Sequence, residues 1–181
     1  MSKLQEKKIG SELVFKGRFL QIFRDEVILP NGHQSYREYI KHPGASMIIP
    51  VLDDGRVVML KQYRHAVGQV FLEFPAGKLD QGEAPLKTAQ RELQEETGYT
   101  AKTWRYLTDI HPVIGYADEK ISIFLAQDLV LGKSNLDHNE IVEVVYLTFD
   151  DLMGRVQRGE VTDVKTQIGA FWLKQILAHS W

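Results

Sequence analysis

Three glutamates and an arginine lie close together on one predicted helix, at Arg91, Glu92, Glu95 and Glu96. Because an α-helix completes a turn every ~3.6 residues, Glu92 shares a face with both Glu95 and Glu96. Carboxylates held this close repel one another unless positive charge lies among them. Clustered oxygen ligands suit a hard divalent ion such as Mg²⁺ or Mn²⁺, which can also take phosphate oxygens. The spacing therefore predicts half of a metal-dependent phosphate site, with Glu83 as a further acid before the helix.

The same charges have a plainer interpretation, which is an acidic and solvated helix face. Arg91 would then pair with Glu95 at a spacing of four residues and complete a surface charge ladder. The glycines around the helix favour the chemical interpretation. Gly77 and Gly82 bracket a tight loop before the helix, and Gly98 suits the position after its last turn. A surface helix needs caps, but it does not need this whole pattern.

The complete pattern is G-x5-E-x7-R-E-U-x-E-E-x-G-U, in which U is a bulky apolar residue, and it resembles the Nudix box. The matching residues are Gly77, Glu83, Arg91, Glu92, Leu93, Glu95, Glu96 and Gly98. Tyr99 departs from the pattern, since the family usually has an aliphatic residue there, and this concerns packing rather than chemistry. A motif with so many fixed positions is far more specific than a lone glycine pattern. The resemblance implies the Nudix fold, an α/β/α sandwich with a mixed sheet.

The resemblance to the Nudix box also implies a set of metal ligands. Glu92 and Glu96 would bind the ion together with the backbone carbonyl of Ala76, and Glu95 would complete or hold this shell. The expected ion is Mg²⁺, with Mn²⁺ as the alternative, because both prefer oxygen ligands. Arg91 is expected to orient the glutamates through a salt bridge inside the box rather than to touch the substrate.

Hydrolysis of a diphosphate also needs a base within hydrogen-bond reach of the attacking water. Glu140 is the candidate, because it follows a polar loop and precedes a predicted strand. Glu119 is the rival candidate. Related proteins often have two or more acids where this chain has Asp137-His138-Asn139-Glu140, so the choice between the two stays open.

Residues outside the box narrow the resemblance to one branch of the family. Three stretches resemble the ADP-ribose and nucleoside-diphosphate-sugar pyrophosphatases, namely Glu73-Phe74-Pro75-Ala76-Gly77-Lys78, Lys61-Gln62-Tyr63-Arg64 and Arg37-Glu38-Tyr39. The substrate contacts that this implies are Arg64, Arg37, Glu73 and Glu119. A guanidinium fork matches phosphate oxygens, which favours Arg64 as a clamp on a phosphate or the terminal sugar. Such enzymes usually form dimers that exchange an N-terminal sheet, so a homodimer is expected.

One departure from the branch concerns the choice of substrate. Members specialised for ADP-ribose commonly have a proline at a set distance after the box, where this chain has Gly115. A glycine makes the loop over the terminal sugar less rigid. The expected substrates are therefore several nucleoside diphosphate sugars, ADP-ribose and GDP-mannose among them.

The composition excludes several other classes of protein. The 181 residues are 44% hydrophobic and 25% charged, as in ordinary globular domains, and their net charge of −2 indicates no nucleic-acid or anionic-membrane partner. The chain has no cysteine, which excludes disulfides, thiolate zinc sites and a cysteine nucleophile. Residues 1–8 are charged and precede no apolar segment, which argues against a signal peptide or membrane span and predicts a cytoplasmic protein.

The hydrophobic pattern predicts the elements that must hold these residues. Alternating runs in residues 12–40 predict a small N-terminal antiparallel β-sheet with a turn at Pro30-Asn31-Gly32. The expected division is an N-terminal sheet region that forms the dimer, residues 1–44, and a catalytic domain, residues 45–181. In that domain we expect strands at residues 45–52, 57–63, 71–74, 103–113, 120–128 and 141–147, a loop at 129–139, and helices at 85–97, 149–158 and 166–178.

These observations predict an enzyme that hydrolyses the diphosphate linkage of nucleoside diphosphate sugars to a nucleoside monophosphate and a sugar phosphate. One alternative is a Nudix hydrolase of a dinucleoside polyphosphate, a damaged nucleoside triphosphate or capped RNA, the last disfavoured by the near-neutral charge. The other is a non-catalytic sensor that binds ADP-ribose and regulates transcription. Such a sensor would tolerate loss of the box carboxylates and would need a DNA-binding domain, so the intact box favours the enzyme.

Overall fold

The computed structural model describes residues 3–133 and 141–179, which fall into two compact units. The first unit contains the N-terminal residues through Pro43 together with His111–Lys120. The second contains Gly44–Ile110 and the chain from Ile121 onward. Because the box helix lies wholly inside the second unit, the geometry of the box depends on that unit alone.

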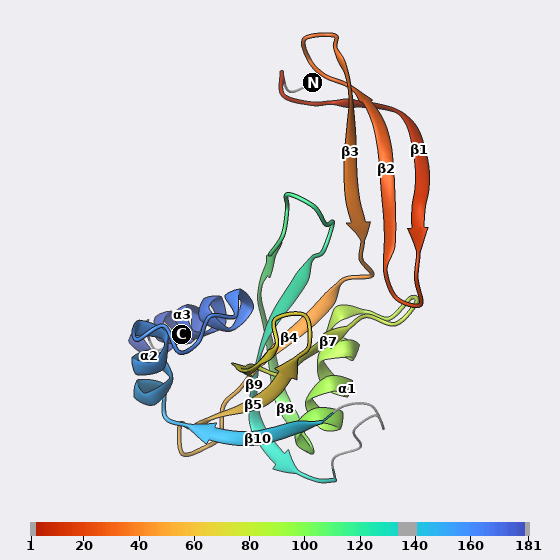
Figure 1. Cartoon of the computed structure of the whole chain (residues 1–181). Coiled ribbons are helices and arrows are strands. Elements are labelled where there is room, and N and C mark those ends of the chain that lie inside the picture. Colours follow the sequence, from red (N-terminus) through yellow and green to blue (C-terminus); the bar gives the residue numbers. More distant parts are fainter. Residues whose placement is uncertain (1–2, 134–140, 180–181) are drawn as a thin grey trace. The chain divides into compact units, whose positions relative to one another are not determined.

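The first unit is built on a three-stranded antiparallel sheet, as the sequence pattern predicted (Figure 1). Its strands are β1 (Lys7–Lys16), β2 (Gln21–Ile28) and β3 (Gln34–Lys41), in that spatial order. Gly32, in the turn between β2 and β3, has a φ of +85°, a conformation that favours glycine. The sheet begins before the expected residue 12, and Asp25 on β2 contacts both Lys8 at 2.8 Å and Ser11 at 2.6 Å.

The segment His111–Lys120 joins this unit through backbone hydrogen bonds to the end of β3. The N–H of Ile40 donates to the carbonyl of Tyr116 at 2.9 Å, and the N–H of Asp118 donates to the carbonyl of Ile40 at 3.2 Å. The Asp118 side chain also accepts from the backbone N–H of His42 at 2.7 Å. These contacts explain why an interior segment belongs with the N-terminal strands.

The second unit is a mixed α/β structure, which confirms the predicted fold class. One sheet has the order β7-β4-β9-β8, with β4 parallel to β9 and the other pairs antiparallel, and a second antiparallel sheet has the order β10-β5-β6. The strands are β4 (Ala45–Pro50), β5 (Val57–Arg64), β6 (Gln69–Glu73), β7 (Ala76–Lys78), β8 (Tyr99–Ile110), β9 (Ile121–Leu131) and β10 (Val142–Leu147). The helices are α1 (Pro85–Thr97), α2 (Phe149–Gln157) and α3 (Val164–His179).

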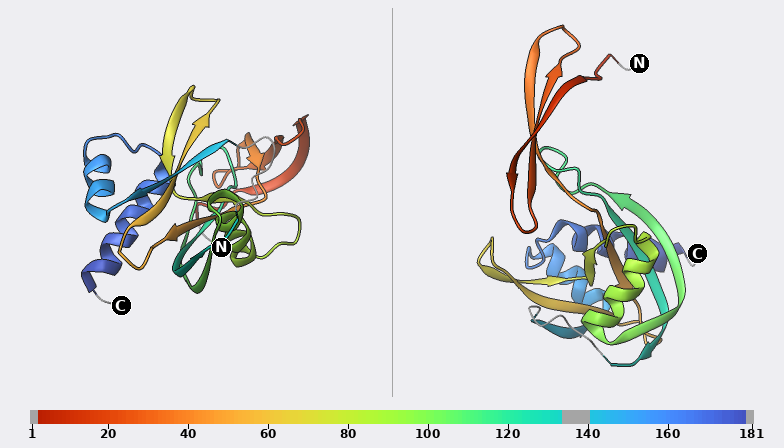
Figure 2. Two further views of the ribbon diagram at one scale, coloured as in Figure 1. Left: turned by 90° about the horizontal axis from the view of Figure 1, so that it is seen from below. Right: turned by 90° about the vertical axis from the view of Figure 1, so that its right-hand side faces the viewer.

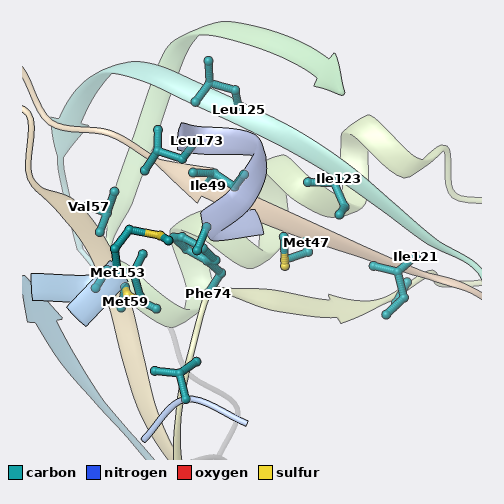
Figure 3. Close-up of a cluster of buried hydrophobic side chains, with 14 residues drawn as sticks. Met47, Ile49, Val57, Met59, Phe74, Ile121, Ile123, Leu125, Met153 and Leu173 are labelled. Atoms are coloured by element: carbon teal, nitrogen blue, oxygen red, sulfur yellow. The ribbon is translucent and has the colours of Figure 1, made fainter. Parts of the chain in front are cut away.

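Strand β4 lies at the centre of this unit and is buried on both faces. Met47 and Ile49 enter one hydrophobic cluster with Leu173 of α3, and Figure 3 shows these side chains gathered around Phe74. Ile48, which points the other way, enters a second cluster with α1 residues. Helix α1 therefore covers one side of the strands and α2 with α3 the other, as Figures 1 and 2 show. Among the described residues, no helix has the length and apolarity needed to cross a membrane.

Several expected boundaries in this unit were wrong, among them the end of β8 at Ile110 instead of residue 113 and the start of α3 at Val164 instead of residue 166. β8 begins at Tyr99 and β9 continues to Leu131, whereas we expected the strands to begin at residue 103 and to end at residue 128. The two strands pair from Ile110↔Ile121 to Tyr99↔Leu131, so residues 99–102 and 129–131 belong to the same hydrogen-bonded ladder, and the expected loop begins too early. The segment Ala76–Lys78 also forms a strand, because it pairs with β4.

Candidate functional site

The box helix is α1, and its bounds match the expected residues 85–97. Pro85 occupies its first turn, where an N–H would have no partner within the helix. Gly98 ends the helix in a left-handed conformation, with a φ of +77°, and its N–H donates to the carbonyl of Gln94 at 2.9 Å. Local chemistry therefore sets both ends of the helix that carries the acids.

Two of the box glutamates are buried beside β7. Ala89 and Leu93 of α1 are fully buried in the core, and this contact fixes the rotation of the helix. Glu92 and Glu96 lie beside that apolar stripe and are only 9% and 4% exposed. The backbone N–H of Ala76 donates to Oε2 of Glu96 at 3.0 Å. The fold thus brings the start of β7 to the glutamates, as the metal-binding hypothesis requires.

Gly77 lies so close to the Glu92 carboxylate that a side chain at position 77 would displace it. A Cβ atom at position 77 would lie 1.8 Å from Oε1 of Glu92, far inside van der Waals contact. The requirement for glycine comes from this close approach of backbone to carboxylate. The first glycine of the box, Gly77, therefore leaves the space that the Glu92 carboxylate occupies.

Arg91 joins three of the box carboxylates. Its Nη1 donates to Oε1 of Glu92 at 2.7 Å and to Oε2 of Glu95 at 2.9 Å, and its Nη2 donates to Oε2 of Glu83 at 2.9 Å. A further hydrogen bond of 3.1 Å runs from Nη2 to the carbonyl of Lys78. The planar guanidinium offers donors in several fixed directions, which a lysine could not do. Arg91 thus orients the acids from within the box.

The hydrogen bonds with Arg91 set the charge state of Glu83. They lower the pKa of the Glu83 carboxyl to about 2, and Thr88 Oγ1, at 2.8 Å, contributes to the same effect. The same contacts raise the pKa of Arg91 above its ordinary value. Glu83 is therefore ionised at every pH near neutrality, and it acts here as a partner of Arg91.

The oxygen donors in the box fit a divalent cation. Within the described residues, no three acidic or histidine side chains are arranged as a ready-made metal cluster. Glu92 and Glu95 instead contact Arg91, and Glu96 faces the backbone of Ala76. Two buried carboxylates and a nearby backbone segment still offer the hard oxygen ligands that Mg²⁺ and Mn²⁺ prefer, with water completing the shell. The donor set fits such an ion, with the carbonyl of Ala76 as the backbone ligand that the box implies.

Arg64 and Glu73 form a second charged group in the same unit. Nε and Nη2 of Arg64 donate to the two carboxylate oxygens of Glu73, each at 2.7 Å. Glu73 is only 3% exposed, so its geometry favours holding Arg64 over reaching a ligand itself. Glu73 and Arg64 end neighbouring strands, β6 and β5, and Glu73 is two residues before Pro75 and three before Ala76.

The remaining predicted site residues lie elsewhere in the chain. Arg37, in the first unit, ion-pairs with Glu6 and donates to the carbonyl of Tyr36 at 2.9 Å. Glu119, also in the first unit, lies 3.6 Å from Nε2 of His42. Glu140 lies outside the described residues. The choice between Glu140 and Glu119 as general base therefore stays a prediction.

Sequence reasoning missed the residues at the start of α3 that reach Glu73. Lys165 contacts Oε2 of Glu73, and Thr166 Oγ1 accepts from the backbone N–H of Phe74 at 3.1 Å. The carboxylate of Asp163, just before α3, accepts from the N–H of Thr166 at 3.0 Å. An Asp three residues before a helical Thr is a recognisable N-cap signal, and it could have moved the expected helix start. No local pattern indicated Lys165.

We expect Glu83→Gln to lower the stability of the protein in a pH-dependent way. Because the folded state holds the pKa of Glu83 at about 2, below its ordinary 4.5, its stabilising effect is complete above pH 4.5 and disappears as the pH falls towards 2. Urea unfolding should show a loss of about 1–2 kcal/mol at pH 7 that shrinks over this window.

The matched control is Glu143→Gln, which removes an exposed acid paired with Lys61 at 2.9 Å. Its effect should stay below ~1 kcal/mol, since exposed ion pairs contribute little. A pH-independent loss in Glu83→Gln would mean that Glu83 does not stabilise the protein through its charge.

Comparisons with known proteins agree with this geometry. A family model described as NUDIX domain matches residues 41–165, and one described as nucleoside diphosphate sugar hydrolase N-terminal domain matches residues 6–40. Over 176 residues the chain is 43% identical to an ADP-ribose pyrophosphatase of Bacillus subtilis, covering 96% of this chain and 95% of the relative. It is 38% identical over 177 residues to a methanol dehydrogenase activator of Bacillus methanolicus, covering 96% of each.

A solved structure with low sequence identity to this chain has the same fold. The crystal structure of an ADP compounds hydrolase superposes with a TM-score of 0.87 at 22% identity, covering 99% of this chain and 98% of the other. At that identity the likeness concerns the fold alone, and it extends over the first unit as well as the second. The box residues, the two family matches and this fold confirm the resemblance proposed from the sequence, and the chain belongs to the NUDIX family of hydrolases.

Proposed function

We propose that the protein hydrolyses the diphosphate linkage of nucleoside diphosphate sugars, ADP-ribose among them, to a nucleoside monophosphate and a sugar phosphate. The observation that carries this proposal is the burial of Glu92 and Glu96 against the backbone of β7, with Arg91 holding the neighbouring acids. The substrate class is supported by the match to a nucleoside diphosphate sugar hydrolase N-terminal domain and by the relative named ADP-ribose pyrophosphatase.

The residues that would hold the metal are Glu92, Glu96, Glu95 and the carbonyl of Ala76, with Mg²⁺ as the proposed ion and Mn²⁺ as the alternative. When bound, such an ion neutralises phosphate oxygens and lowers the pKa of water. Arg91 holds the carboxylates of Glu83, Glu92 and Glu95 close together. Gly77 keeps the Glu92 carboxylate in place, because no side chain comes between it and β7.

The remaining steps are assigned to residues around the box. Water attacks phosphorus, the phosphoanhydride bond breaks, and a carboxylate takes the proton of the attacking water. Glu140 is the proposed base, with Glu119 as the alternative.

Arg64 is proposed to bind a phosphate or the terminal sugar, because its guanidinium is fixed by Glu73 while its side chain stays 44% exposed. Arg37 is proposed to contact the nucleotide.

We further propose a homodimer built on the sheet of the first unit. The strands of that sheet and the connection between β1 and β2 expose several large apolar side chains, namely Ile9, Leu13, Val14, Phe15, Phe19, Leu20 and Tyr36. A second copy of the chain would cover them.

We also propose that the protein is cytoplasmic and that it has no nucleic-acid partner. The net charge of −2 supports the absence of a nucleic-acid partner.

We expect Glu96→Gln to keep the fold and to lose turnover. The amide still accepts the hydrogen bond from Ala76, but it no longer offers a charged ligand, so kcat for ADP-ribose with Mg²⁺ should fall by about two or more orders of magnitude. Phosphate-ester products are measured together with circular dichroism, and Glu143→Gln serves as the control for removal of an acid. Full turnover by Glu96→Gln, or by wild type in excess EDTA, would refute the assigned metal site.

Light scattering tests the dimer. The full chain should give about twice its mass of 20.8 kDa. Phe15→Lys places a charge in the proposed interface and should shift the protein towards monomer. The equally exposed Leu177 on α3 provides the control, since Leu177→Lys should leave the mass unchanged. A monomeric wild type with full activity at nanomolar concentration would contradict the proposal.

The substrate range should be broad because residue 115 is glycine. A Cβ there would have no neighbour within 4 Å, so proline would act by restricting the backbone. We expect kcat/KM for ADP-ribose and GDP-mannose to lie within about a hundredfold, and Gly115→Pro to widen the gap while Gly115→Ala changes it little. A wild-type preference for ADP-ribose of several thousandfold over every hexose nucleotide would rule out this role for Gly115.

A further inference from the structure

Four charged side chains form a balanced network beside the box. Arg64 donates through Nε and Nη2 to the two oxygens of Glu73, and Lys165 binds Oε2 of the same carboxylate. Nζ of Lys165 also donates to Oδ2 of Asp163 at 2.9 Å. Two cations and two anions therefore alternate along the chain of contacts Arg64–Glu73–Lys165–Asp163.

The two cations of this network differ in their access to solvent. The side chain of Lys165 is 11% exposed, so it is committed to its two carboxylate partners. Arg64 is far more exposed, and its Nη1 makes no hydrogen bond to the described residues. Burial alone would raise the pKa of Glu73, but Arg64 and Lys165 together hold it below its ordinary value. Glu73 is thus a buried anion that two cations share.

The start of α3 also holds the backbone that leads to the metal ligands. Thr166, next to Lys165, accepts from the N–H of Phe74 at 3.1 Å. Two residues beyond Phe74, the N–H of Ala76 donates to Glu96. The first turn of α3 therefore contacts the segment before β7 through both a side-chain ion pair and a backbone hydrogen bond.

We propose that Lys165 is a positioning residue for substrate binding: by sharing the Glu73 carboxylate with Arg64, it reduces how far that carboxylate offsets the attraction of Arg64 for the anionic substrate. Without Lys165, Arg64 is the only cation among the described residues that binds Glu73, and Asp163 loses its ion pair with Lys165, so the three remaining groups carry a net negative charge. Both changes weaken attraction to a diphosphate. This inference rests on the proposed function, since it assumes that Arg64 faces a nucleoside diphosphate sugar.

The test combines Lys165→Met, which keeps the length of the side chain and removes its charge, with Lys165→Arg, which keeps the charge. For Lys165→Met we expect KM for ADP-ribose to rise about tenfold while kcat stays within about threefold. Lys165→Arg should restore KM to within about threefold of wild type. Lys174→Met, which removes an exposed lysine from the same helix, is the control and should leave both constants unchanged.

A double-mutant cycle shows whether Lys165 acts through Arg64. In an Arg64→Gln background, Lys165→Met should raise KM by only about threefold or less, because the effect through Arg64 is already lost and only the repulsion from Asp163 is added. An equal tenfold effect in that background would overturn the proposal. So would a fall in kcat with unchanged KM, which would indicate a purely structural role. If Lys165→Met does not fold, Lys165→Gln provides the same comparison.

Calorimetric binding of ADP-ribose in EDTA separates this inference from the proposed function. Binding by wild type without hydrolysis in Mg²⁺ would refute only the proposed function, and the same variants would then be compared by their dissociation constants. Hydrolysis by wild type with an unchanged KM in Lys165→Met would refute only the inference. If wild type neither binds nor hydrolyses ADP-ribose or GDP-mannose, both are overturned.

Discussion

The close approach of β7 to α1 is the constraint on which the rest of the site depends. A carboxylate on α1 contacts the backbone of Gly77 so closely that a single Cβ would lie 1.8 Å from it. Such contact requires α1 to lie firmly on the sheet, which Ala89 and Leu93 achieve by full burial. It also requires β7 to pair with β4, the strand buried between the two hydrophobic clusters. Packing on both faces of β4 therefore sets the position of the buried acids.

The carboxylates around Arg91 and the carboxylate of Glu73 have different numbers of cationic partners. Towards the surface, one arginine, Arg91, collects three carboxylates, so the cluster keeps a net negative charge that suits a cation. At the other end, Glu73 is buried and shared between Arg64 and Lys165. Lys165 is shared further with Asp163, so these four groups balance in charge, and the exposed one among the two cations is Arg64. An acidic cluster for a cation and an exposed arginine for a phosphate are the two features on which the proposed function depends.

The fold was predictable wherever its signals are local. The bounds of α1 match the expected residues, because proline and glycine signals lie at its ends and the apolar stripe repeats along it. The N-terminal antiparallel sheet and the mixed sheet were also expected. The extents of β8 and β9 were not, because the pairing of Tyr99 with Leu131 and the burial of Tyr99 depend on segments distant in the sequence. The role of Glu140 as general base stays a prediction, and so do the substrate contacts of Arg64, Arg37, Glu73 and Glu119.

The sequence by itself determined the chemistry of the box, since helical periodicity places Glu92, Glu95 and Glu96 together whatever surrounds them. It also determined the family, because the motif has many fixed positions over a short span. Only the tertiary structure decided which carboxylates are buried and which cations reach them. Lys165 meets Glu73 across 92 residues of chain. Local spacing carries no information about such a contact, because it exists only when α3 packs on the strands that end at the box.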